Sequence, residues 1–432
     1  MGIAQNSLLI FIARAASYAF MAVGGLMLAR LLGPQARGEY ALLNALASAA
    51  AMLLTFGLGT SNAVFASQNR LPAKTLFSHS LLFGLIVGGL AALMLAWHAD
   101  HWAPAFLQDV PVEHAQLMAW GIPFYILFNC LLGLSQGRQQ FELYSKANVL
   151  RPLLFLCGFA VLFFGGLRNV LAGLWAYVLS FVGAAAMLIF KLRLGRGEAY
   201  TFNASVWKLQ FQQGWTIYLA ELFSFLLYRI DVLLVGFFLD VKHAGFYSIV
   251  TFFAESLWFL PSSIGVVLLP SSGARPPDEM RQLAPRLVRL VFFATSLIVS
   301  LLWQIDQFLV TYAFGEDFLP AVLPLHLSYL GIVAMSVNKV IASYALGSGH
   351  AQWNTIVSLA GLLANVVLNL LLIPRWGIAG AAIAMSLSFS LMALLMILWL
   401  RRFAGITLGK IFILQPDDWR FVRELWQKFA LR

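Results

Sequence analysis

The stretch Tyr228-Arg229-Ile230-Asp231, followed by Val232-Leu233-Leu234-Val235-Gly236-Phe237-Phe238-Leu239, places an arginine and an aspartate at the start of an apolar run. Ionisable side chains are costly in hydrocarbon, so inside a membrane they usually face a cavity or a partner. The stretch therefore predicts a membrane helix in which Arg229 and Asp231 have a specific task.

This stretch also opens the second of two similar halves. Gly245-Phe246-Tyr247 echoes Gly38-Glu39-Tyr40, and Gly380 echoes Gly173, at the same offset of 207 positions. Internal repeats of this kind are typical of transporters. This common offset therefore indicates a duplicated, transporter-like architecture.

Composition sets the class of protein. The chain is 61% hydrophobic and 11% charged, with a mean hydropathy of +0.83, whereas soluble domains are about one quarter charged. We therefore expect an all-α polytopic membrane protein. Cys130 and Cys157 lie in apolar segments, which favours small core residues over a disulfide or a metal pair.

Windows of about 20 apolar residues suffice to cross a bilayer. By that rule we expect about twelve spans, at residues 8–30, 39–66, 77–97, 115–135, 147–167, 170–192, 213–239, 244–270, 286–306, 319–345, 354–373 and 377–400. The expected organisation is a six-helix bundle over residues 1–195, a linker over 196–212, a second six-helix bundle over 213–402 and a tail over 403–432.

Charge distribution orients these spans. Most of the 28 Lys and Arg fall in the connections and the tail on one side, while Asp100, Asp109 and Glu113 lie on the other. By the positive-inside rule both termini are then cytoplasmic, with Arg30 and Arg37 in the first outer connection. The net charge of +10 is explained by this topology, so we expect no nucleic-acid partner.

The tail has an amphipathic pattern. Asp417 is a candidate helix N-cap, and Trp419, Val422, Leu425 and Trp426 fall on one helical face. Aromatic and basic residues on such a helix indicate that it lies on the inner membrane surface. A solvated tail helix is the alternative.

Several short motifs carry a resemblance to a known family. They are Arg30-Leu31-Leu32-Gly33-Pro34 with Gly38-Glu39-Tyr40, Phe56-Gly57-Leu58-Gly59, Arg229-Ile230-Asp231 with Ala244-Gly245-Phe246-Tyr247, Phe314-Gly315-Glu316-Asp317-Phe318, and Ile373-Pro374-Arg375-Trp376-Gly377. In this order they resemble the bacterial polysaccharide flippases of the multidrug/oligosaccharidyl-lipid/polysaccharide exporter superfamily.

The resemblance implies a fold and an activity. The fold would be two six-helix bundles in a V shape around a central cavity that opens alternately to either side. The activity would be transfer of a polyprenyl-diphosphate-linked oligosaccharide, an O-antigen or exopolysaccharide repeat unit, across the bacterial inner membrane. Membrane lipids and polysaccharide polymerase machinery are the implied neighbours, and a monomer is the expected state. A lipid II flippase and a multidrug exporter of the same superfamily are the related alternatives.

A lipid-linked diphosphate requires cationic partners, and Arg presents a planar fork suited to phosphate oxygens. The candidates are Arg14 in the first span, Arg151 beside Pro152, Arg229 and Lys339. Arg14 is flanked by small residues, which fits a cavity cation or a buried structural pair. Arg151 fits the diphosphate at the cytoplasmic mouth or a positive-inside anchor. Polar side chains for the sugar would be Asn44, Asn62, Gln136 and Asn338.

Ion coupling has two candidate routes. Asn365 and Asn369, four residues apart, share one helical face, and with a carboxylate from the seventh span such as Asp231 they could bind sodium through oxygen atoms. They could instead hydrogen-bond between helices, with Asp231 a structural partner. Protonation of Glu221 or Glu255 is the other route. No other cofactor is expected.

Other classes of function fit less well. A membrane glycosyltransferase would need a catalytic domain or clustered acids, and His98 and His101 in an outer segment form no tight metal motif. No P-loop or dinucleotide motif predicts direct ATP use. A drug exporter needs an acidic cavity for cations, and a scaffold protein explains neither the repeat nor the intramembrane charges. We therefore predict a transporter and not an enzyme.

Overall fold

The computed structural model describes residues 3–107, 109–192, 204–274, 277–405 and 409–418, and within them it contains helices and no strand. The first half consists of α1 (Ile3–Thr55), α2 (Leu58–Ser67), α3 (Ala73–Leu82), η1 (Phe83–Val87), α4 (Gly88–Trp97), α5 (Ala99–Phe106), α6 (Val112–Ala119), α7 (Ile122–Gly137), α8 (Phe141–Phe164) and α9 (Val170–Leu192). The second consists of α10 (Ala204–Phe238), α11 (Val241–Leu257), α12 (Phe259–Ala274), α13 (Pro277–Ala313), η2 (Glu316–Ala321), α14 (Val322–Gly347), α15 (Ala351–Ala404) and α16 (Gly409–Phe412).

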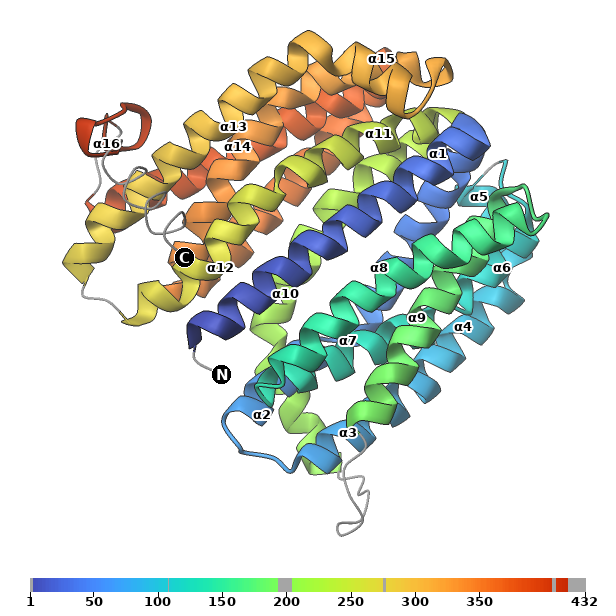
Figure 1. The fold of residues 1–432 in the computed structure, drawn as a ribbon, viewed down its shortest axis with the longest axis horizontal. Helices are drawn as coiled ribbons and strands as arrows, with labels where there is room; N and C mark the ends of the chain where they lie inside the picture. The colour runs from blue at the N-terminus through green and yellow to red at the C-terminus, as the bar shows by residue number, and fades with distance from the viewer. Residues whose placement is uncertain (1–2, 108, 193–203, 275–276, 406–408, 419–432) are drawn as a thin grey trace.

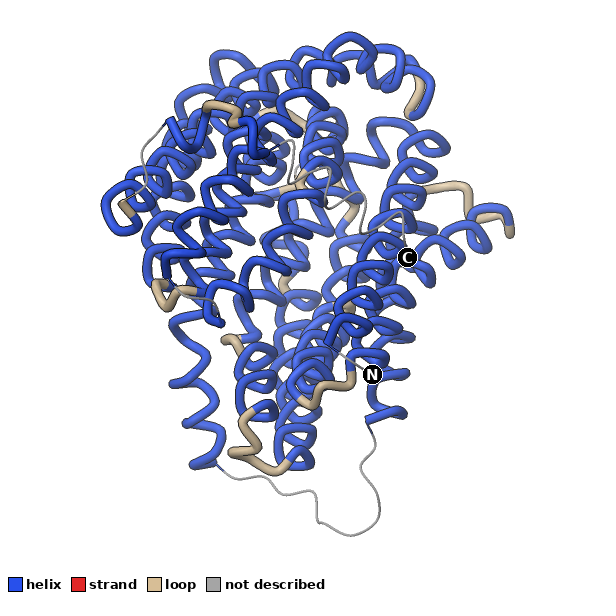
Figure 2. The backbone as a smooth tube through the Cα atoms, turned by 60° about the vertical axis from the view of Figure 1, so that its left-hand side comes forward, coloured by secondary structure: helices blue, strands red, loops and turns tan. Residues whose placement is uncertain are grey.

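The helices form two bundles. Figure 1 shows α2–α9 gathered on one side and α12–α15 on the other, with α1, α10 and α11 running between them. The tube in Figure 2 shows long, roughly aligned helices joined by short loops. The predicted all-helical, two-bundle fold is confirmed.

The described helices include eight stretches that are long and apolar enough to cross a membrane. Two of them, Leu9–Thr55 and Ala351–Phe403, are 47 and 53 residues long, about twice the length that one crossing requires. The chain is therefore a multi-pass membrane protein. Twelve crossings and cytoplasmic termini stay predictions.

Glycines interrupt both of these long helices. Gly33 has φ 77° inside α1, and Gly377 has φ 57° inside α15. Residues with a side chain rarely adopt such angles, whereas glycine does so at little cost. Pro34 directly follows the first break, where the helical hydrogen-bond pattern is already interrupted, and Pro374 lies in the last helical turn before the second.

One described helix begins earlier than the sequence predicted. α10 begins at Ala204, so the second part of the predicted linker 196–212 is helical. Gln210 is fully buried there, donating to Asn62 Oδ1 at 2.8 Å and accepting at its backbone carbonyl from Ser61 Oγ at 3.0 Å. These bonds tie the start of α10 to the first half and explain why it is ordered as a helix.

The predicted amphipathic surface of the tail falls on residues 419–432, which lie outside the described residues. Just before it, Asp418 is buried against Arg289 of α13, with Arg289 Nε donating to Asp418 Oδ2 at 2.6 Å. A second oxygen contact to the same guanidinium completes a two-pronged ion pair. The tail is thereby attached to α13 at Asp418.

The two halves meet where α1 and α11 cross, at the repeated glycines. A Cβ on Gly38 would overlap the carbonyl oxygen of Val241, and a Cβ on Gly245 would overlap that of Pro34. Pro34 and Val241 are themselves related by the offset that relates Gly38 to Gly245. The contact is therefore symmetric, and the repeat detected in the sequence places two equivalent glycines backbone to backbone.

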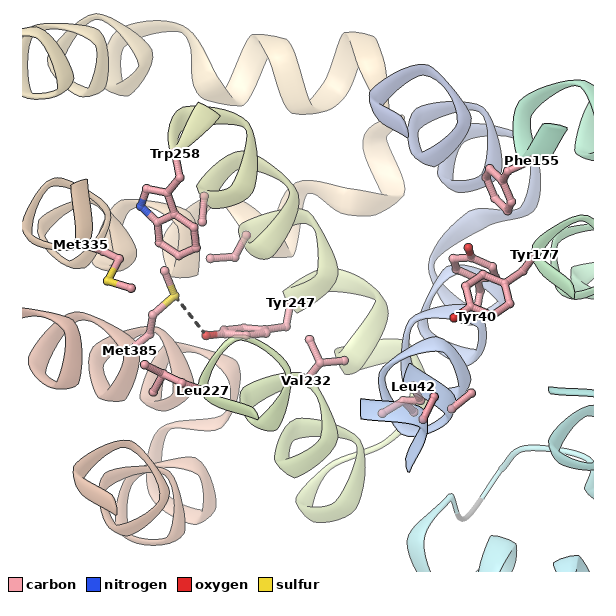
Figure 3. Packing of buried hydrophobic residues seen from close by; sticks show 14 of the residues in the cluster. Tyr40, Leu42, Phe155, Tyr177, Leu227, Val232, Tyr247, Trp258, Met335 and Met385 are labelled. Carbon is pink, nitrogen blue, oxygen red and sulfur yellow. Dashed lines mark hydrogen bonds between the residues drawn. The ribbon is translucent and has the colours of Figure 1, made fainter. Parts of the chain in front are cut away.

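The repeated tyrosines pack on equivalent elements of the two halves. Tyr40 contacts Phe155 and Tyr177 from α8 and α9, whereas Tyr247 reaches toward Met385 in the second part of α15 (Figure 3). Each tyrosine thus joins the central crossing to the outer helices of its own half.

We predict that Gly38→Ala lowers the free energy of unfolding by about 1–3 kcal/mol, because overpacking of a close contact forces backbones apart. The thermal midpoint of the purified protein measures this. Gly89→Ala in α4 is the matched control, since no heavy atom lies within 4 Å of its Cβ position. Equal midpoints for the two variants would contradict a tight crossing.

Candidate functional site

A cavity of about 360 Å³ lies between the two halves. α1, α7, α8 and α9 form its wall on one side, and α10 and α11 form the other. Its position matches the central cavity that the two-bundle prediction implies.

Three arginines and one glutamate line this cavity: Arg37, Arg151, Arg229 and Glu255. Arg229 Nη1 lies 3.1 Å from Glu255 Oε1, and Arg37 Nε donates to Ser248 Oγ at 3.0 Å. The Arg151 guanidinium lies 5.0 Å from the centre of the Phe181 ring, a cation–π contact. The wall therefore carries more positive than negative charge.

Arg229 keeps a free hydrogen-bond donor. Its Nε is buried and has no hydrogen-bond partner among the described residues. A buried donor without a partner costs free energy, so Glu255 satisfies the Arg229 guanidinium only in part.

Arg37 corrects a sequence prediction. It was placed in an outer connection, but it lies on the helical part of α1 that follows the break at Gly33, in the cavity wall. The sequence contained a signal for this position of Arg37, because Arg37 directly precedes Gly38 of the internal repeat. The charge distribution alone could not separate a loop arginine from a helical one.

Amide side chains complete the polar part of the wall. Asn44, which was predicted to contact sugar, lines the cavity. Asn129 and Asn148 do so as well, and the sequence analysis did not identify them. Their side-chain Nδ2 groups donate to backbone carbonyls four residues earlier, at 2.9 Å in each case. Their side-chain Oδ1 atoms are thereby left to accept hydrogen bonds from a ligand.

Two predicted residues lie apart from the central wall. Arg14 lies one helical turn before Tyr18, which lines the cavity, but Arg14 itself does not. Asn62 is fully buried, donating to Ser80 Oγ at 2.8 Å and to the Cys130 carbonyl at 3.0 Å. Asn62 therefore holds α2 against its neighbours in the first half, and its Oδ1 accepts from Gln210 of α10.

Lys339 and Asn338 also lie apart from the arginines. They line a second cavity, of about 400 Å³, together with Glu221. Lys339 therefore lines a different cavity from Arg229, and a shared role for them on the diphosphate stays a prediction. Glu221 accepts a hydrogen bond from Thr60 Oγ1 of the first half at 3.1 Å.

Asp231, Asn365 and Asn369 come together in a third place, buried inside the second half. Asn369 Nδ2 donates to Asp231 Oδ1 at 2.7 Å, and Tyr247 donates its hydroxyl proton to Asp231 Oδ2 at 3.0 Å. Asn365 contributes its backbone carbonyl at 2.9 Å and its side-chain Oδ1 at 3.0 Å to the same Asn369 Nδ2. Three acceptor oxygens therefore surround the Nδ2 atom of Asn369.

Comparison with known proteins gives a consistent picture. A family model described as "Polysaccharide biosynthesis protein" matches residues 27–323, more than half of the chain. The chain is 25% identical over 392 residues to "Probable flippase AglR" of Haloferax volcanii, covering 84% of this chain and 76% of that protein. It is 22% identical over 210 residues to an uncharacterized membrane protein of Methanocaldococcus jannaschii, covering 48% of this chain and 41% of that one.

Solved structures show the same fold. An inward-facing multidrug resistance MATE transporter of the MOP superfamily superposes with a TM-score of 0.76 at 15% identity, covering 90% of this chain and 94% of that chain. The lipid II flippase MurJ in an inward closed conformation superposes with a TM-score of 0.75 at 14% identity, covering 94% of this chain and 89% of that chain. With this fold, and with the family match across both halves, the chain belongs to the polysaccharide biosynthesis protein family.

Proposed function

We propose that this protein is a flippase that moves a polyprenyl-diphosphate-linked oligosaccharide across the membrane by alternating access, for the synthesis of cell-surface polysaccharide. The observation that carries the proposal is the arginine-rich cavity between the two bundles. A diphosphate has several phosphate oxygens, and guanidinium groups bind such oxygens in pairs. Arg37, Arg151 and Arg229 offer three of them around one space.

The remaining wall suits the other parts of such a substrate. Asn44, Asn129 and Asn148 present amide groups to sugar hydroxyls, while the polyprenyl chain can stay in lipid outside the bundles. On this proposal the sugar and diphosphate cross in the cavity as the two halves rock against each other.

The relatives are consistent with this proposal and with one alternative. AglR is named a probable flippase and MurJ a lipid II flippase, whereas the MATE proteins are named multidrug transporters. A drug exporter for organic cations needs a cavity with negative charge. The excess of arginine over glutamate here favours an anionic substrate, so the proposal is a flippase and neither an exporter of cations nor an enzyme. We propose the bacterial inner membrane as its location.

For coupling, we propose that Asp231, Asn365 and Asn369 bind a sodium ion. Asn369 Oδ1 is buried without a partner among the described residues. Turning the Asn369 amide over would place that oxygen beside Asp231 Oδ1 and the two Asn365 oxygens, where a sodium ion between them would be bound by oxygen atoms alone. Hard cations prefer such all-oxygen surroundings. The ion would supply the positive charge that balances the buried Asp231 carboxylate.

We predict that Arg37→Ala and Arg229→Ala each reduce transfer of a fluorescent polyprenyl-diphosphate oligosaccharide about tenfold or more. Truncating one member of a charge-assisted contact costs about 2–5 kcal/mol, and about 1.4 kcal/mol is a factor of ten. Vesicles carrying the substrate in one leaflet give the rate. Arg168→Ala, in an exposed loop, is the control. Full activity in both cavity variants, or efflux of a cationic dye in place of transfer, argues against the flippase.

We predict that sodium, compared with potassium at equal ionic strength, raises the thermal midpoint of the wild-type protein, because a ligand that binds only the folded state stabilises it. Asp231→Asn should abolish the increase. Asp306→Asn is the control, since Asp306 is also buried in the second half but bonds to Tyr329 and His326. A sodium response that survives Asp231→Asn refutes this site, whereas a wild type that does not respond to sodium leaves protonation of Glu221 or Glu255 as the route.

A further inference from the structure

The second cavity lies inside the C-terminal half, between α10, α12, α14 and α15. It has about 400 Å³, and none of the three central arginines lines it. Tyr228 faces this cavity while its neighbour Arg229 faces the central one. The two cavities are therefore lined by different side chains of α10.

Lys339 is the cation of this second cavity. Its Nζ donates to the Tyr228 hydroxyl at 3.0 Å and lies 5.0 and 5.3 Å from the ring centres of Tyr228 and Trp258. Within the part of the chain that the structure describes, no carboxylate forms an ion pair with it. An intramembrane ammonium without a counter-charge is costly, so its anion is expected to arrive with a ligand.

The rest of the wall presents hydrogen-bond acceptors. Asn338 is 5% exposed, and its Oδ1 is buried with no partner among the described residues. Asn354, which also lines this cavity, likewise has a buried Oδ1 with no partner among the described residues. Two buried amide oxygens without donors are unfavourable unless something donates to them. A ligand with several hydroxyl groups supplies those donors.

Glu221 adds a carboxylate at a distance from Lys339. It lies seven residues, and so about 10 Å, before Tyr228 on α10, on the same face of the helix. Its oxygens accept from Thr60 and have further acceptor capacity for a hydroxyl. The cavity thus runs from an ammonium at one end to a hydroxyl acceptor at the other.

We propose that this second cavity binds a carboxylate-bearing sugar, with Lys339 on the carboxylate and Asn338, Asn354 and Glu221 accepting from the hydroxyls. One ammonium matches one negative charge, whereas a diphosphate requires the several guanidinium groups of the central cavity. The inference rests on the proposed function, because the sugar is part of the lipid-linked glycan, and it names an acidic glycan as the class of substrate.

The test compares two substrates with the same polyprenyl diphosphate, one carrying a disaccharide that ends in glucuronic acid and the other a disaccharide that ends in glucose. Lys339→Met should lower vesicle transfer of the glucuronic acid substrate about tenfold and leave transfer of the glucose substrate within about twofold. Lys146→Met, which removes a lysine exposed on α8, should change neither. If Lys339→Met does not fold, Lys339→Gln takes its place.

Unchanged transfer of both substrates, or an equal loss for both, overturns the acidic-sugar site while the flippase stands. If the wild type moves neither substrate, the flippase fails, and a binding measurement decides on the cavity alone. Stabilisation of the wild type by glucuronate, but not by glucose or inorganic phosphate, and its loss in Lys339→Met support the site. Stabilisation by phosphate as strong as by glucuronate overturns it in favour of a phosphate or lipid headgroup.

Discussion

The backbone contact between Gly38 and Gly245 is the constraint on which the arrangement of the two halves depends. Because neither residue has a side chain, α1 and α11 approach closely enough for their backbones to touch. The same two helices then line the central cavity with Arg37, Ser248 and Glu255. A wider crossing would move these groups apart, so the geometry of the charged wall follows from the absence of two methyl groups.

The helix that carries the sequence Tyr228-Arg229-Ile230-Asp231 distributes its polar side chains among three places. Successive residues on a helix point about 100° apart, and the structure uses each direction differently. Tyr228 faces the second cavity, Arg229 the central cavity, and Asp231 the buried cluster with Asn365 and Asn369. One short stretch thereby supplies a residue to the central cavity, to the second cavity and to the cluster with the two asparagines.

Much of the fold was predictable because membrane helices and duplications leave strong patterns in a sequence. The family motifs have a further physical content: four of them contain a glycine with positive φ, namely Gly33, Gly57, Gly315 and Gly377. The motifs therefore mark positions where helices are broken, where glycine alone is readily accepted.

The site was only partly predictable, for a different reason. Charges inside spans are easy to recognise, but their grouping depends on how helices rotate against each other. Arg229 and Lys339 were assigned to one task and lie in two cavities, whereas Arg37 was assigned to a loop and lies in the wall. The cluster of Asp231 with two asparagines was found from helical spacing because Asn365 and Asn369 lie on one helix face. No such spacing rule relates α1 to α11.

The hydrogen bond from Arg37 to Ser248 joins the two halves in the cavity wall, beside the crossing of α1 and α11. An anion that takes up the Arg37 guanidinium competes with Ser248 for it, so occupancy of the cavity changes the balance of contacts between the bundles. A ligand shifts a conformational equilibrium only through such a difference in affinity between states. On the proposed function, the side chain that binds the substrate is therefore also one of the contacts that set the relative position of the bundles. Substrate binding and rearrangement of the bundles are then thermodynamically linked.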